Sequence, residues 1–280
     1  LNHKQVSELI AHDAIDYVAF TGSVSGGQGV QQSAINRFIP VGLELGGKDP
    51  AYVRSDADLK SSIANLVDGA FYNCGQSCCG IERIYVHESI YDDFVGGFID
   101  EVKQYKVGSP CNKTTTLGPM VRTAATQWIK QQTQAAIREG ATACISKNTF
   151  GDIPTLGAYI SPQVLVGVNH NMSVMREESF GPVVGIMAVS NDQDAIHLMN
   201  DSDYGLTASV WSQDITTVKN LLKKIEAGTV FMNRCDYLDP ALAWTGVKNT
   251  GRGYTLSQLG YHQLTRAKSY HFKLSVNVQC

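Results

Sequence analysis

The chain has 280 residues, of which 18% are charged, and a formal net charge of −3, so it is long enough for one large domain or two modest ones. Its 23 lysines and arginines are scattered, which argues against a nucleic-acid partner, and no apolar run approaches the roughly 20 residues of a membrane span. Seven cysteines without a CxxC pair predict reduced thiols, a cytoplasmic location and no metal site.

The first forty residues predict a helix, a buried strand and a second helix. The first helix covers residues 3–12, and the strand covers 17–20. Thr21-Gly22-Ser23 then turns into a helix that contains Gly27 and ends near Ala34. A helix that begins at such a turn directs free N–H groups toward an anion, and Gly22 lets a phosphate approach closely. An ordinary turn is the alternative for this short pattern.

A lone carboxylate follows within an apolar stretch. Residues 38–41 predict a strand that leads into Glu44, which is flanked by Leu43 and Leu45. An acid in apolar surroundings is rarely buried without a function, whereas the alternative is a surface glutamate in a salt bridge. The pair Gly46-Gly47 then provides flexible backbone next to Glu44.

The reactive group that we predict is the thiol of Cys78. An apolar helix face that starts at Ser55 or Asp56 leads into the polar, glycine-containing stretch 71–79, and a strand follows at 83–87. A thiol on such a connection is better placed for chemistry than one in the core. The alternative is a cysteine that packs as a small hydrophobe, which is how we interpret Cys74.

Helices and strands alternate through the remainder of the chain. The predicted helices are 89–102, 123–139, 192–200 and 214–227. The predicted strands are 142–146, 158–160, 163–166, 183–189, 207–211 and 229–233. This alternation predicts an α/β fold with a largely parallel sheet, and the apolar run 183–189 suits a strand covered on both faces. A lone strand is predicted at 268–274.

Four motifs stand in order along the chain: Phe20-Thr21-Gly22-Ser23, Leu43-Glu44-Leu45-Gly46-Gly47-Lys48, Gly75-Gln76-Ser77-Cys78 and Glu177-Glu178-Ser179-Phe180-Gly181-Pro182. Together they resemble the signatures of the aldehyde dehydrogenase superfamily, from about residue 9 to about residue 274. The resemblance implies the remainder of a Rossmann-type cofactor domain at 1–46, a catalytic domain at 47–260 and an oligomerisation segment at 261–280. By the family's standard the chain starts late, without the N-terminal part that carries an oxyanion-stabilising asparagine.

The resemblance also implies an activity: oxidation of an aldehyde to a carboxylic acid with NAD(P), through a cysteine thiohemiacetal and a thioester. Cys78 would be the nucleophile, with Cys79 as its rival, and Glu44, 34 residues upstream, would be the base. The implied cofactor-binding residues are Gly22, Ser23, Gly27, Leu45, Gly46, Glu178 and Phe180. Many relatives carry a proton-relay glutamate about where this chain has Thr255.

The implied partners are a small aldehyde substrate and further copies of the chain, as a homodimer or homotetramer, with neither nucleic acid nor membrane. The expected cofactor is NAD, with NADP as the alternative. A second hypothesis is a truncated, catalytically inactive family member with a binding or structural role. Binding of the cofactor by this chain would discriminate between the two hypotheses.

Overall fold

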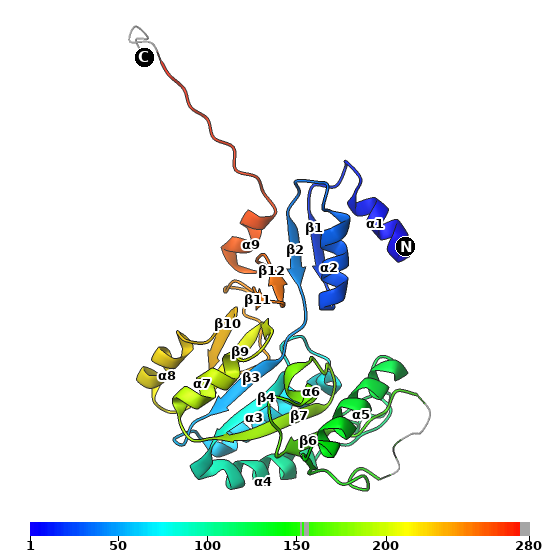
Figure 1. The fold of residues 1–280 in the computed structure, drawn as a ribbon, viewed down its shortest axis with the longest axis vertical. Helices are drawn as coiled ribbons and strands as arrows, with labels where there is room; N and C mark the ends of the chain where they lie inside the picture. Colours follow the sequence, from blue (N-terminus) through cyan, green and yellow to red (C-terminus); the bar gives the residue numbers. More distant parts are fainter. Residues whose placement is uncertain (152, 154–156, 275–280) are drawn as a thin grey trace.

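Two sheets of different size organise the molecule (Figure 1). The computed structural model describes residues 1–151, 153 and 157–274. The larger sheet has the order β10-β9-β3-β4-β7-β6-β5, and every pair in it is parallel except β5–β6. Its strands are β3 (Asp49–Val53), β4 (Ile81–His87), β5 (Thr142–Ala143), β6 (Gln163–Val166), β7 (Val183–Val189), β9 (Thr207–Trp211) and β10 (Thr229–Met232). The predicted α/β architecture with a largely parallel sheet is confirmed.

Helices cover both faces of this large sheet. The crossover from β3 to β4 and the longer one from β4 to β6 progress in one direction, so α3 (Leu59–Phe71) and α4 (Tyr91–Val102) lie on one face. The chain then returns to the other side of β3, which places α7 (Asp192–Asn200) and α8 (Ile215–Leu222) on the opposite face. As a result β3 and β9 are buried along their whole length.

The smaller sheet has the order β1-β2-β12 and stands above the larger one in Figure 1. It consists of β1 (Val18–Thr21), β2 (Val41–Glu44) and the short antiparallel β12 (Gly251–Arg252), with α1 (His3–Ile10) and α2 (Val24–Ser33) beside it. β2 alternates between buried and half-buried residues and β1 between half-buried and exposed ones, because only one face of the sheet is well covered. The buried core of this unit is small: Ile10, Val30, Ala34, Val41, Leu43 and Leu45.

The chain crosses between the two units twice, at 45–48 and at 246–250, and Thr250 joins the crossings. The carbonyl of Thr250 accepts from Leu45 N at 2.8 Å, and its hydroxyl donates to the Gly46 carbonyl at 2.9 Å. The same hydroxyl accepts from Gly205 N at 3.0 Å. With 1% of its surface exposed, Thr250 is a buried joint between the small unit and the large one.

The remaining elements are short or peripheral. They are the 3₁₀ turns η1 (Tyr72–Gly75) and η2 (Glu88–Ile90), the helices α5 (Thr123–Arg138), α6 (Ser173–Arg176) and α9 (Ser257–Gln263), and the strand pair β8 (Tyr204–Gly205) and β11 (Val247–Lys248). Within the described ranges, no helix is both long and apolar enough to cross a bilayer.

Several predicted element boundaries were wrong. The helix expected from Ser55 or Asp56 begins after Asp58, whose side chain accepts from Ser61 N, because Asp56 instead accepts bonds from the turn before α8. The helix expected over 214–227 ends at Leu222, the strand expected at 142–146 stops at Ala143, and 158–160 forms no strand.

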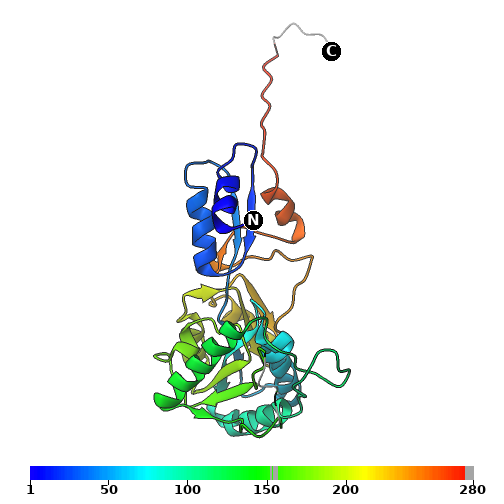
Figure 2. The ribbon, with the colours of Figure 1, turned by 90° about the vertical axis from the view of Figure 1, so that its right-hand side faces the viewer.

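The strand expected at 268–274 is also absent from this chain. Residues 265–274 instead leave α9 as an extended segment that projects away from both units (Figures 1 and 2). Strand structure needs a hydrogen-bonded neighbour, and the body of this chain provides none for this segment in the part that the structure describes.

Candidate active site

Three segments that precede neighbouring parallel strands converge at one edge of the large sheet. Residues 46–48 lead into β3, residues 78–80 lead into β4, and residues 178–182 lead into β7. Because β3, β4 and β7 are adjacent and parallel, the segments at their amino ends meet. Glu44, at the carboxyl end of β2, faces this edge from the small unit. The fold therefore brings Glu44, Cys78 and Glu178 to one junction.

The loop before Cys78 is held by a left-handed turn. After α3, Asn73 and Cys74 adopt φ values of 50° and 59°, and Gly75 follows at 69°. A Cβ at Gly75 would overlap the Gly181 carbonyl, so a glycine is required where this loop crosses the 178–182 segment. The Gln76 side chain then accepts from Val121 N at 2.8 Å, which fixes the loop against the start of α5.

The two adjacent thiols lie in different environments. Cys79 is buried, with 4% of its surface exposed, whereas Cys78 is partly exposed. The Cys79 thiol donates to Asp236 Oδ1 at 2.9 Å, and Ser77 Oγ donates to the same oxygen at 2.8 Å. Asp236 thus anchors the residues on both sides of Cys78.

The pKa values of these thiols move in opposite directions. A hydrogen bond with the Cys79 thiol lowers the pKa of Cys78, against burial and the charges of Asp236 and Glu44, which raise it. The pKa of Cys79 is raised far above its usual range by that same hydrogen bond, by burial and by Asp236. Because Cys78 is the partly exposed thiol and Cys79 donates its hydrogen to Asp236, Cys78 is the better placed of the two to act as a thiolate, which is the reactive form.

Thr255 orients the Glu44 carboxylate. β12 pairs with β2 so that Gly251 lies opposite Glu44, and the chain then returns Thr255 to the same carboxylate. Thr255 Oγ1 donates to Glu44 Oε1 at 2.6 Å. A partly buried carboxylate that keeps its second oxygen available can still accept a proton from a neighbouring water.

Glu178 lies against the glycine pair that follows Glu44. Its Oε1 accepts from Gly47 N at 3.2 Å, and a Cβ at Gly46 would overlap the Glu178 carboxylate. Burial, followed by the negative charge of Glu82, raises the pKa of Glu178 to about 7. Gly46 is therefore needed for the close approach of this carboxylate.

Phe180 and Trp128 border a hollow beside Glu178. Phe180 adopts a left-handed φ of 48°, and its side chain is 43% exposed. The hollow has a volume of about 430 Å³, and the start of α5 lines its other side. Trp128 Nε1 donates to the Glu178 carbonyl at 3.2 Å, which ties α5 to this segment.

The glycine–serine turn presents polar groups at the start of α2. Ser23 caps this ten-residue helix by accepting from Gly26 N at 3.2 Å, and its hydroxyl lies 3.2 Å from that of Ser25. Both serines are exposed, and this set of hydroxyl and N–H donors suits a phosphate group. Gly27 differs, because it is buried and a Cβ there would overlap the Leu45 side chain. Gly27 thus allows α2 to pack on Leu45.

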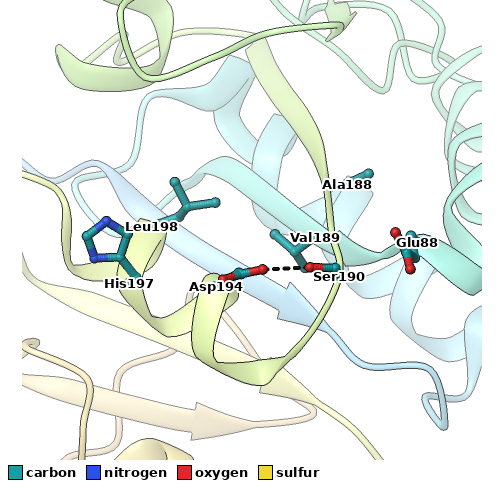
Figure 3. Close-up of a pocket in the computed structure, with 7 residues that line it drawn as sticks. All are labelled: Glu88, Ala188, Val189, Ser190, Asp194, His197 and Leu198. Atoms are coloured by element: carbon teal, nitrogen blue, oxygen red, sulfur yellow. Dashed lines mark hydrogen bonds between the residues drawn. The ribbon is translucent and has the colours of Figure 1, made fainter.

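A second hollow, of about 410 Å³, lies at the opposite edge of the large sheet (Figure 3). Its lining comes from the end of β7, from α7 and from Glu88. Its one hydrogen bond between lining side chains joins Ser190 Oγ to Asp194 Oδ2 at 2.6 Å. Cys78, Glu44 and Glu178 do not line it, so we place the candidate site at the junction. In the described part of the chain, no cluster of three metal-ligating side chains occurs.

Two buried charged residues beside the junction, Lys48 and Glu82, were not among the predicted site residues. Lys48 and Glu82 are almost fully buried and form an ion pair with Nζ and Oε2 2.5 Å apart. Glu82 lies within the apolar strand-forming stretch 81–87, and a charge in such a stretch was the available signal, whereas Lys48 between Gly47 and Asp49 offers no such signal. The bonds of Asp236 to Ser77 and Cys79 were not predicted from the sequence either.

Comparison with known proteins decides the family. The model of the aldehyde dehydrogenase family matches residues 2–270. The chain belongs to the aldehyde dehydrogenase family. Among curated aldehyde dehydrogenases, it is 35% identical over 263 residues to a probable betaine aldehyde dehydrogenase from Schizosaccharomyces pombe, and 34% identical over 257 residues to lactaldehyde dehydrogenase from Escherichia coli.

Solved aldehyde dehydrogenase structures have the same fold. A betaine aldehyde dehydrogenase from Staphylococcus aureus in complex with NAD⁺ matches 92% of this chain with a TM-score of 0.85 and 32% identity. An NADP-dependent glyceraldehyde-3-phosphate dehydrogenase from Bacillus halodurans, complexed with NADP, matches 93% with a TM-score of 0.86 and 36% identity. The matched regions make up 51% and 53% of those chains. Likewise, the chain spans about half the length of the curated relatives, 52% and 53% for the two enzymes above.

Proposed function

We propose that this chain carries the catalytic part of an NAD(P)-dependent enzyme that oxidises an aldehyde to a carboxylic acid. The observation that carries the proposal is the asymmetry of the two thiols: Cys78 is partly exposed, while Cys79 is buried and donates its thiol hydrogen to Asp236. The positions of Glu44 and Glu178 at the same junction support it.

In the proposed first step, Cys78 Sγ attacks the carbonyl carbon of the aldehyde. The carbonyl π bond breaks, and its electron pair moves to the oxygen, which gives a thiohemiacetal. The backbone N–H of Cys78 is a donor for the developing oxyanion. Loop 73–79 is held by the left-handed turn and by Asp236, so the thiol is already in place when substrate arrives.

A bound nicotinamide ring would accept the hydride that leaves the thiohemiacetal carbon, which leaves a thioester on Cys78. Glu44 then takes a proton from the water that attacks this thioester, and the C–S bond breaks to release the acid. The hydrogen bond from Thr255 keeps the Glu44 carboxylate directed at the junction. In the overall reaction, the aldehyde, the oxidised cofactor and water are converted to the acid, the reduced cofactor and a proton.

For the cofactor we propose NAD, with its pyrophosphate at Gly22, Ser23 and the start of α2. Glu178 would accept from the ribose hydroxyls beside the nicotinamide, while Leu45, Gly46 and Phe180 would border the ring. The exposed hydroxyls of Ser23 and Ser25 and the hollow beside Glu178 fit such a molecule. Gly27 would contribute through the packing of α2. Solved relatives bound to NAD⁺ or NADP support this class of cofactor.

We further propose that residues 265–274 pair with another copy of the chain, in a homodimer or homotetramer. Tyr270, Phe272 and Leu274 are each at least 70% exposed, and they alternate along the extended segment. Such an unpaired, apolar, extended segment is a template for strand pairing between chains.

The test compares Cys78→Ala with the matched control Cys79→Ala in an assay of NADH formation from a simple aldehyde. We expect Cys78→Ala to lower kcat by at least about 10³-fold and Cys79→Ala to retain most of it. Equal losses in both variants would contradict the assignment of the nucleophile. A wild-type protein that neither binds NAD nor turns over aldehyde would favour the non-catalytic hypothesis.

A further inference from the structure

We propose that the buried ion pair Lys48–Glu82 holds the backbone conformation of the segment 178–180, and that it thereby raises the affinity for the cofactor. The inference rests on the proposed function, in which Glu178 and Phe180 contact the nicotinamide and its ribose. It concerns two residues that touch neither the substrate nor the cofactor in that proposal.

Both oxygens of the Glu82 carboxylate are used by the segment. Ser179 N donates to Oε2 at 2.8 Å and to Oε1 at 3.1 Å, and Phe180 N donates to Oε1 at 2.8 Å. Lys48 Nζ donates to Oε2 and also to Ser179 Oγ, at 3.0 Å. The pair therefore binds two consecutive backbone amides and one hydroxyl of the segment.

This arrangement explains the backbone conformation of Phe180. A left-handed φ of 48° is unfavourable for a bulky residue and persists only where its surroundings determine it. The Phe180 amide bound to Glu82, next to the equally bound amide of Ser179, provides that constraint. The turn places the Phe180 side chain at the hollow beside Glu178.

The same pair links the cofactor segment to the nucleophile and to the base. Lys48 follows Gly47, whose N–H donates to Glu178, and lies four residues after Glu44. Glu82 lies four residues after Cys78, at the start of β4. One buried ion pair thus fixes the spacing of all three segments at the junction.

The fold alone does not require this pair. Apolar residues of similar size often replace a buried ion pair without loss of stability, whereas removal of one partner leaves an uncompensated charge. Beyond the buried charges of Asp49 and Arg83, the core positions of β3 and β4 are filled by apolar residues such as Val53 and Ile84, which shows that the sheet accepts such residues. The pair's specific contribution is the set of bonds to Ser179 and Phe180.

The experiment therefore replaces both partners at once, in Lys48→Met/Glu82→Met, and measures amide hydrogen exchange over residues 176–182 without any cofactor. We expect exchange at Ser179 and Phe180 to become at least about tenfold faster, since both donors lose charged acceptors. The control Glu88→Gln removes a carboxylate from an exposed position beyond the end of β4, and it should exchange like the wild type.

Kinetics separates positioning from general stability. In the full-length protein we expect the KM for NAD to rise about tenfold in the double variant, while the rate of Cys78 alkylation by iodoacetamide stays within twofold. Glu82→Gln, which retains one acceptor oxygen, should raise this KM by about threefold. This second variant keeps the proposal testable if the double variant does not fold.

Unchanged exchange at Ser179 and Phe180 would overturn the proposal whatever the kinetics. Faster exchange with an unchanged KM for NAD would also overturn it, because the pair would then be structural only. If the wild type shows no turnover with NAD, the proposed function fails, and the exchange measurement alone decides whether Glu82 holds the segment.

Discussion

The two units of the molecule differ in how they hold their polar groups. In the large unit, the groups of the candidate site lie on loops that run directly into buried parallel strands, and a continuous core backs them. In the small unit, a helix and a half-covered sheet present Ser23 and Ser25 to solvent from a core of six buried residues. Cys78 and Glu178 thus stand on the unit with the large core, whereas Glu44 and the proposed phosphate site stand on the unit with less buried surface.

The largest expected effect on stability comes from the core of the large unit. Phe98 on α4 is fully buried, with its ring 5.6 Å from that of Phe94 and 6.3 Å from that of Phe71. Phe98→Ala should lower the free energy of unfolding by about 3–5 kcal/mol, because it leaves a cavity under the helix that leads to Cys78. Denaturant unfolding measures this, and a loss below about 1 kcal/mol would contradict a rigid core there.

A substitution in the small core should act more locally. Leu43→Ala removes a buried side chain of β2 and should cost about 2–3 kcal/mol. We expect the amides of β1 and β2 to exchange faster while those of β4 keep their protection, because the small unit opens first. Equal acceleration in both sheets, measured by hydrogen exchange, would show that the two units unfold together.

The junction between the units should respond to pH through Glu178. Its pKa of about 7 lies above the ordinary value of 4.5, so between these pH values the folded state binds more protons than the unfolded state. Stability therefore falls as pH rises toward 7, and the loss is complete above it. Glu178→Gln should raise stability by about 1–3 kcal/mol at pH 8 and leave it unchanged near pH 4.

Thermal unfolding at both pH values tests this expectation for Glu178→Gln, with Glu177→Gln at the exposed neighbouring position as control. A gain of the same size at both pH values would exclude titration of Glu178 as the cause.

The smallest expected effect belongs to the cap of α2. Ser23→Ala removes the acceptor for Gly26 N and should cost about 1 kcal/mol. If the start of α2 also binds the pyrophosphate, this variant should weaken NAD binding severalfold without changing the alkylation rate of Cys78. Binding measured by calorimetry distinguishes the two roles, with Ser33→Ala at the other end of α2 as the matched control. Equal affinity in both variants would place the pyrophosphate elsewhere.

The sequence was sufficient for the fold class and for the family, because motif order and the alternation of helices and strands are local signals. The roles of Cys78, Glu44 and Glu178 stay predictions, although the structure places these residues at one junction. Their neighbours could not be predicted, because Glu82 binds Ser179 across 97 residues of sequence and Thr255 binds Glu44 across 211. Such contacts follow from strand order, which short patterns do not reveal.

Errors at element ends have a similar origin. Asp56 is a residue type that often caps helices, but its carboxylate accepts from Gln213 N and Asp214 N in a distant turn. At the start of the predicted helix 192–200, Asp192 also has the side chain of a cap, but Asn191 caps α7 and Asp192 accepts from Tyr52 and Arg54. In both cases a long-range bond competes with the local one that the sequence suggests.

Thr250 has a mechanical consequence for the two units. The hydroxyl and the carbonyl of Thr250, on one chain crossing, bind the backbone of the other crossing. The two crossings therefore cannot slide past each other without breaking those bonds. Together with the adjacent pairing of β12 with β2, these bonds resist stretching and shear, and we expect rotation of the small unit about the two crossings to be the softest motion. The small unit should therefore rotate relative to the large unit about the two crossings, and Glu44 and the Gly22-Ser23 turn beside it lie at the end of the small unit that is nearest to them.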